Sequence, residues 1–78
     1  MIEILKDNRA LLAEGLEAAL IGYTNGANVL AVYDYEKCVE ALQKQHNWTQ
    51  EESIEWMDFN VVGSGYGEKT PIFITLDE

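Results

Sequence analysis

Apolar side chains recur at helical spacing at the start of the chain. In residues 2–14, IEILKDNRALLAE, isoleucine and leucine occupy positions 4, 5, 11 and 12, a spacing that indicates one face of an α-helix. Gly15 follows directly, and glycine readily adopts the left-handed conformation in which many helices end. The pattern therefore predicts a helix over 2–14 that ends at Gly15.

The next stretch, residues 16–24, is compatible with two structures. Its alanines and leucines favour continued helix, whereas in its second half two apolar side chains alternate around a glycine. The pair Asn25-Gly26 then separates it from the apolar run VLAVYD, and Asn-Gly between two apolar runs indicates a β-hairpin. We predict a hairpin with arms at 18–24 and 29–33. The alternative is a mainly helical protein in which 16–24 stays helical.

A second helix is predicted over 35–46. Asp34 precedes it, and aspartate is a favoured N-cap residue. One face of this helix would carry the side chains at i, i+3, i+4, i+7 and i+11, namely Tyr35, Cys38, Val39, Leu42 and His46. Cys38 lies in the middle of the apolar face, so we expect a buried structural thiol. His46 lies in the last turn, where a structural or capping role is expected.

The third helix has the clearest start in the chain. Thr49-Gln50-Glu51-Glu52 matches a capping box, with Thr49 at the N-cap and Glu52 three residues later. We predict a helix over 50–61 that ends near Gly63. The apolar run PIFITL at 71–76 predicts a final strand.

These elements predict an α+β fold in one domain spanning 1–78. The predicted order is helix, hairpin, helix, helix, strand, with a three-stranded antiparallel sheet that helices cover on one face. A chain of 78 residues buries only about 60% of its unfolded surface. The small core and the aromatic residues Tyr23, Tyr33, Trp56 and Phe59 lead us to expect a homodimer or larger assembly.

Charge restricts the classes of partner. Fourteen acidic residues oppose five basic ones, for a net charge of −9, so nucleic acid and anionic membranes should repel the chain and basic protein surfaces should attract it. There is one cysteine and one histidine, too few for an ordinary zinc site. The unpaired cysteine and the acidic N-terminal segment, which does not look like a signal peptide, indicate a reducing cytoplasm. No cofactor is expected.

The stretch GSGYGEKTP at 63–71 partly matches a nucleotide phosphate-binding loop. That motif reads G-x-x-x-x-G-K-[ST] and opens a helix. Aligned on Lys69 and Thr70, the first glycine falls on Gly63, but the second falls on Glu68, whose carboxylate would repel phosphate. Pro71 also biases the preceding residue away from helical geometry. We predict a tight connection into the last strand, with Tyr66 displayed on it.

The third helix carries the densest acidic set in the chain. Glu51, Glu55 and Asp58 share one predicted stripe, and no lysine or arginine occurs between residues 45 and 67 to offset them. The alternative to a binding surface is an ordinary solvated face. The predicted partner-contacting residues are Glu51, Glu52, Glu55, Asp58, Trp56, Phe59 and Tyr66.

Three strings of the sequence, YDYEKCVEAL, WTQEESIEWMDFNVVG and GEKTPIFI, resemble a group of small proteins encoded by tailed bacteriophages and prophages. The shared pattern falls within 31–75. This chain has Trp48 where methionine is usual and Ser53 where alanine is usual. The resemblance implies expression inside an infected bacterium and supplies no catalytic residues.

Small size, acidity and this resemblance together predict a non-enzymatic protein of the host bacterial cytoplasm. It would bind and inhibit a host protein with a basic surface, for example a nucleic-acid-binding defence nuclease such as a CRISPR effector. The alternative is a self-associating structural or assembly accessory protein of a phage.

Overall fold

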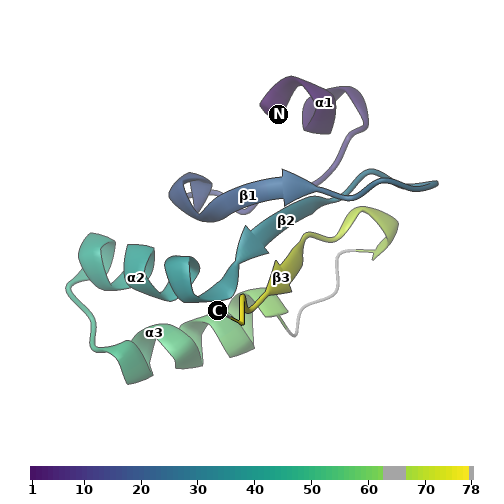
Figure 1. The fold of residues 1–78 in the computed structure, drawn as a ribbon. Helices are drawn as coiled ribbons and strands as arrows, with labels where there is room; N and C mark the ends of the chain where they lie inside the picture. The colour runs from purple at the N-terminus through teal and green to yellow at the C-terminus, as the bar shows by residue number, and fades with distance from the viewer. Residues whose placement is uncertain (63–66, 78) are drawn as a thin grey trace.

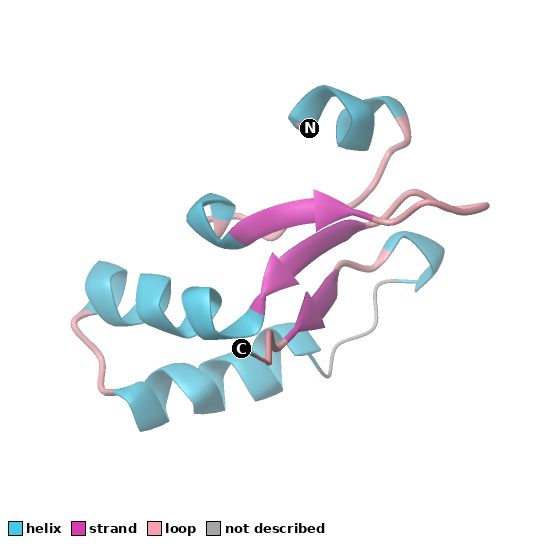
Figure 2. Ribbon diagram, in the orientation of Figure 1, coloured by secondary structure: helices cyan, strands magenta, loops and turns pink. Residues whose placement is uncertain are grey.

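The fold is α+β, as the sequence predicts (Figure 1). The computed structural model describes residues 1–62 and 67–77. Its regular elements are α1 (Ile2–Asp7), β1 (Leu20–Tyr23), β2 (Ala31–Asp34), α2 (Tyr35–His46), α3 (Gln50–Met57) and β3 (Ile72–Ile74). Short 3₁₀ turns cover Glu17–Ala19 and Gly67–Lys69, and a π-helical turn, Asp58–Val62, follows α3. Figure 2 shows α2 and α3 extending together from the end of β2, with α1 apart from them beyond β1.

The sheet is mixed, so the prediction of a purely antiparallel sheet is wrong. The strand order is β1-β2-β3; β1 pairs with β2 antiparallel, and β2 pairs with β3 in parallel register, with Tyr33 opposite Phe73. The reason is the connection: α2 leads away from the end of β2, α3 returns, and the turn at Gly67–Lys69 lies at the end where β2 begins (Figure 1). A helical crossover of this length joins parallel strands.

The predicted hairpin is confirmed, and the mainly helical alternative is wrong, because residues 20–23 form a strand. The hairpin loop is longer than a two-residue turn. Thr24 closes it, since its N–H donates to Leu30 O at 2.9 Å and its hydroxyl bonds both Asn28 O and the Leu30 N–H. Asn25 and Gly26 lie at the exposed tip of this loop.

The first helix is much shorter than predicted. It ends at Asp7, because the Asn8 side chain donates to Ile4 O at 2.8 Å and Arg9 adopts a positive φ of 57°. Residues 10–16 continue without regular structure. Gly15 has the left-handed conformation expected, with φ 87°, but it lies in a turn and not at the end of a helix.

The later helices follow their local sequence closely. Asp34 caps α2 by accepting the Lys37 N–H at 3.3 Å, as predicted. In α3 the α-helical geometry stops at Met57, earlier than the predicted 61, and π-helical geometry follows. Gly63, predicted as the helix stop, lies outside the described residues.

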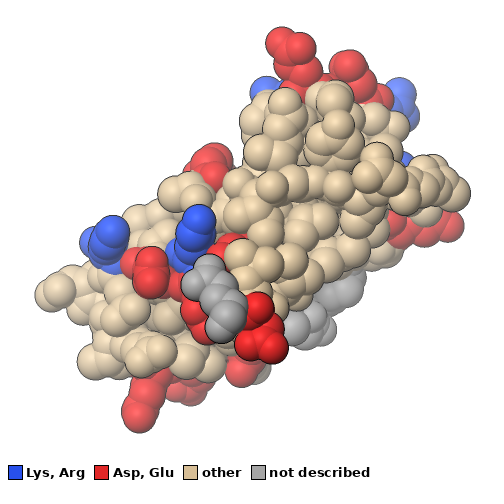
Figure 3. All heavy atoms as spheres, in the orientation of Figure 1, with Lys and Arg blue, Asp and Glu red and all other residues tan. Residues whose placement is uncertain are grey.

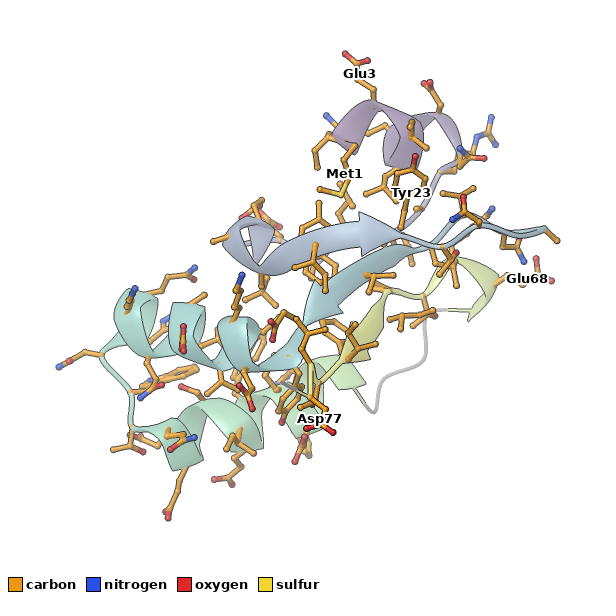
Figure 4. The ribbon with its side chains drawn as sticks, in the orientation of Figure 1. Met1, Glu3, Tyr23, Glu68 and Asp77 are labelled. Atoms are coloured by element: carbon orange, nitrogen blue, oxygen red, sulfur yellow. The ribbon has the colours of Figure 1, made fainter. Side chains whose placement is uncertain are left out.

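One hydrophobic core joins the sheet to α2 and α3. Its most deeply buried members come from α1, the segment before β1, β2, α2 and α3, namely Leu5, Leu16, Ala19, Ala31, Tyr33, Cys38, Leu42 and Met57. Tyr33 stacks on Phe73 with ring centroids 5.4 Å apart. Tyr33 is thus a core residue, not one of the surplus surface aromatics that led us to expect self-association. Tyr23 is half-buried and extends from β1 toward α1 (Figure 4).

Candidate functional site

The start of α3 is held by the predicted capping box. The Thr49 hydroxyl accepts the Glu52 N–H at 3.1 Å, and the Glu52 carboxylate accepts the Thr49 N–H at 2.9 Å. Two backbone donors at the helix start are thereby satisfied. Ser53, which sequence reasoning left unassigned, is fully buried and donates to Thr49 O at 3.1 Å. Glu52 therefore fixes the geometry of its own helix and remains exposed to solvent.

Asp58, another predicted contact residue, is bound within the fold. It accepts a hydrogen bond from the Tyr35 hydroxyl at 3.0 Å, which joins the end of α3 to the start of α2. Burial raises the pKa of Tyr35, and the hydrogen bond to Asp58 raises it further. Glu51 and Glu55 are exposed on α3. The acidic stripe is thus divided between two exposed glutamates and one carboxylate that joins two helices.

The predicted contact residues Trp56 and Phe59 lie beside exposed glutamates, and a third aromatic residue, Trp48, lies next to them. The ring centroids of Trp48 and Trp56 are 6.3 Å apart. His46 stacks on Trp48, with ring centroids 4.3 Å apart. Phe59 is 83% exposed. A hollow of about 390 Å³ is lined by Trp48, Glu52, Glu55, Trp56, Phe59 and Asn60. We call these six residues the aromatic–acidic hollow.

Sequence reasoning found four of the six lining residues and missed Trp48 and Asn60. Trp48 precedes the N-cap of α3, so it is not part of the predicted helix that carries the other lining residues. Its role depends on how the chain between α2 and α3 turns: Asn47 adopts a left-handed conformation with φ 55°. Asn60 donates to Trp56 O at 3.1 Å.

A second groove lies next to the hollow and shares Trp56 and Asn60 with it. It has a volume of about 430 Å³, and its other lining residues are Leu11, Leu12, Ala13, Glu14, Leu16 and Pro71. The segment 10–16 forms one wall because the Ala13 N–H donates to the Tyr33 hydroxyl at 2.8 Å. The irregular segment that follows α1 thus supplies five of the eight residues that line this groove.

Charge is distributed unevenly over the surface. In Figure 3 acidic side chains without basic neighbours lie along the edge formed by α3, whereas acidic and basic side chains lie together over α2 and around α1. Glu68 lies at the opposite side of the molecule from α3 (Figure 4). It therefore does not add to the acidic edge at α3.

The glycine-rich stretch is described only in part. Tyr66 lies outside the described residues, so its predicted contact role stays a prediction. Gly67–Lys69 form a 3₁₀ turn that leads into β3 and not into a helix. The Lys69 ammonium donates to Asn28 Oδ1 at 3.3 Å, and the Thr70 hydroxyl donates to Gly67 O at 2.7 Å. These groups thus make contacts within the fold where a phosphate-binding loop would direct them at a ligand.

Cys38 is fully buried, as predicted. Burial, with a smaller contribution from the Asp34 carboxylate, raises the pKa of its thiol to about 11. The thiol is therefore protonated at neutral pH and is a poor nucleophile. Over residues 1–62 and 67–77, no group of three or more His, Cys, Asp or Glu side chains is placed to hold a metal ion.

Comparison with known proteins supplies no further constraint on the site. No protein-family model, curated protein or solved structure matches the chain. Within the described part of the chain, none of the helices combines the length and the apolar character needed to cross a membrane.

Proposed function

We propose that this protein is a non-enzymatic binding module that contacts another protein through the aromatic–acidic hollow. The observation that carries the proposal is Phe59, an aromatic side chain that is 83% exposed beside two tryptophans and two glutamates. Leaving that much apolar surface in water is unfavourable. Binding energy at interfaces concentrates on a few aromatic and arginine residues, so this arrangement suits a contact surface.

The charge of the chain favours a basic partner. With a net charge of −9 and three exposed glutamates on α3, Glu51, Glu52 and Glu55, the protein attracts positive surfaces and repels phosphate. A host protein whose groove normally binds nucleic acid fits this chemistry, since carboxylates would then occupy the positions of phosphates. The resemblance to small phage proteins favours an inhibitor of such a host protein.

The proposal is tested by photo-crosslinking from the hollow. A benzophenone amino acid placed at Phe59 keeps an aromatic side chain there, and the same amino acid at Leu76, which is also exposed, is the matched control. We expect one bacterial protein to crosslink from position 59 and not from position 76. We also expect the yield to fall as salt rises, because the attraction is electrostatic.

The acidic contribution is tested by the double variant Glu51→Lys with Glu55→Lys. Asp58 is kept, because its hydrogen bond to Tyr35 holds α2 to α3. The variant should stay folded, since both side chains are exposed, and its affinity for the crosslinked protein should fall at least tenfold. A folded double variant that binds with unchanged affinity would remove the acidic surface from the proposal.

Self-association is the second candidate function. It is favoured by apolar side chains left partly exposed near the N-terminus, namely Ile2, Ile4, Leu11 and Leu12, each 37–41% exposed. Light scattering at micromolar concentrations distinguishes the candidates. A monomer mass at every concentration would exclude assembly and leave the binding module.

A further inference from the structure

We infer that the aromatic–acidic hollow binds the guanidinium group of an arginine side chain presented by the partner. This inference deepens the proposed function, on which it rests, by naming the chemistry that the hollow recognises. The hollow, about 390 Å³ in volume, combines three aromatic rings with two carboxylates. An arginine side chain needs both kinds of contact, an aromatic face and a hydrogen-bond acceptor.

The composition of the lining favours a cation. The three aromatic rings that line the hollow belong to Trp48, Trp56 and Phe59, and tryptophan is the best aromatic partner for a cation. One face of Trp48 is covered by His46, which stacks on it at 4.3 Å. Glu52 and Glu55 lie at the same hollow, and among residues 1–62 and 67–77 no lysine or arginine forms an ion pair with either of them. An uncharged apolar side chain would leave both carboxylates without compensation, so charge complementarity selects a cation.

The glutamates remain able to accept hydrogen bonds from a ligand. One oxygen of Glu52 accepts the Thr49 N–H, but an ionised carboxylate has about four acceptor positions. This bond also fixes the carboxylate, because it belongs to the capping box. Glu55 lies one helical turn further along the same face as Glu52, since residues three apart on a helix are neighbours. The two carboxylates therefore line one side of the hollow.

Arginine fits this site better than lysine. Its guanidinium is flat and weakly hydrated, so it can stack on an open aromatic face while its N–H groups donate to a carboxylate. The exposed ring of Phe59 and the tilted tryptophan pair, whose planes meet at 43°, provide such faces. Lysine would place a compact, strongly hydrated ammonium in the same site and lose much of the stacking.

The chain contains its own reporter for this site. Both of its tryptophans line the hollow, so intrinsic fluorescence responds to occupancy without a label. The protein is titrated with N-acetylarginine amide, with the lysine analogue, and with the uncharged citrulline analogue, at constant ionic strength. We expect saturable quenching by the arginine compound, with a Kd on the order of 10–100 mM, the weak binding that one partly exposed cation–π contact and one exposed ion pair allow. The lysine compound should bind about threefold more weakly, and citrulline should not saturate.

Matched variants separate the site from general attraction to an acidic protein. Glu55→Gln removes a lining carboxylate and should weaken arginine binding about fivefold. Glu51→Gln removes the same charge from the same helix outside the hollow and should leave binding unchanged. Phe59→Ala should weaken binding by a similar factor while both tryptophans still report. Equal effects of Glu51→Gln and Glu55→Gln, or equal binding of citrulline and arginine, would overturn the inference.

Failure of this inference is distinguishable from failure of the proposed function. If the Phe59 crosslink and the double lysine variant behave as expected but arginine does not bind, the surface contacts a partner by other chemistry and the arginine site is wrong. If arginine binds in a Glu55-dependent way but no protein crosslinks from position 59, the site stands and the partner contact is wrong.

Discussion

Replacing Tyr33 by Phe tests how the fold holds the segment 10–16 that forms one wall of the groove beside Trp56. Tyr33 is 1% exposed, and its ring stacks on Phe73. Its hydroxyl accepts a hydrogen bond from the Ala13 N–H at 2.8 Å, and the two residues are 20 positions apart in the sequence. Phenylalanine keeps the ring and its packing and removes only the acceptor. The Ala13 N–H then has to find water or remain unpaired.

The expected cost follows from the burial of that donor. A buried donor that loses its partner costs about 1–3 kcal/mol. Ala13 is only half-buried, so water can partly replace the hydroxyl, and we expect about 1–1.5 kcal/mol. For a domain of this size each kcal/mol lowers Tm by about 4–8 °C. The Tyr33→Phe variant should therefore melt about 4–12 °C below the parent.

Thermal and urea denaturation, monitored by far-UV circular dichroism, measure this loss of stability. Hydrogen exchange of the Ala13 amide reports directly on its hydrogen bond to the Tyr33 hydroxyl. The matched control is Tyr23→Phe, because the Tyr23 hydroxyl has no protein hydrogen-bond partner among residues 1–62 and 67–77. The control should change stability by less than 0.5 kcal/mol, on the order expected at the surface. Equal losses in the two variants, or an Ala13 amide that exchanges no faster in Tyr33→Phe, would refute the reasoning.

Four further predictions concern other parts of the chain. The Cys38 thiol should react with a thiol probe only after denaturant is added; fast labelling of the native protein would contradict its burial. Because folding raises the pKa of this thiol from 9.0 to about 11, the stability it contributes is complete below pH 9 and is lost as pH rises through about 11. The loss of stability should reach about 1.4 kcal/mol per pH unit between pH 9 and 11. The Cys38→Ala variant should lose less stability over the same range. Burial also raises the pKa of Tyr33, which lowers stability in the same direction at higher pH. Thr49→Ala removes one bond of the capping box and should cost about 1 kcal/mol in urea denaturation, whereas Thr49→Ser should cost little; equal losses would mean that the hydroxyl is not the cause. Calorimetry with ATP and magnesium should show no heat above dilution, because Glu68 occupies the position where a phosphate-binding loop needs glycine; micromolar binding would contradict this.

Features held by contacts within a few residues were predictable from the sequence. The capping box at Thr49 and Glu52 and the cap at Asp34 each join groups three residues apart, so their residue types imply their geometry. The burial of Cys38 follows from its place on an apolar helical face. The β-hairpin follows from two apolar runs around Asn25-Gly26. At the candidate site, the same local reasoning found Glu52, Glu55, Trp56 and Phe59 because they share one helix or the turn that follows it.

Features that depend on contacts distant in sequence were decided only by the tertiary structure. The parallel direction of β3 depends on where the connection through α2 and α3 returns the chain, and no residue of β3 encodes that direction. The path of residues 10–16 depends on the Tyr33 hydroxyl, 20 residues from Ala13, and on the Lys69 carbonyl, which accepts the Leu11 N–H at 3.2 Å. Asp58 is exposed on the predicted stripe, but its hydrogen bond from the hydroxyl of Tyr35, 23 residues earlier, could not be predicted from the stripe. In each case the deciding partner lies far along the chain, where the spacing of residue types carries no information about distance in space.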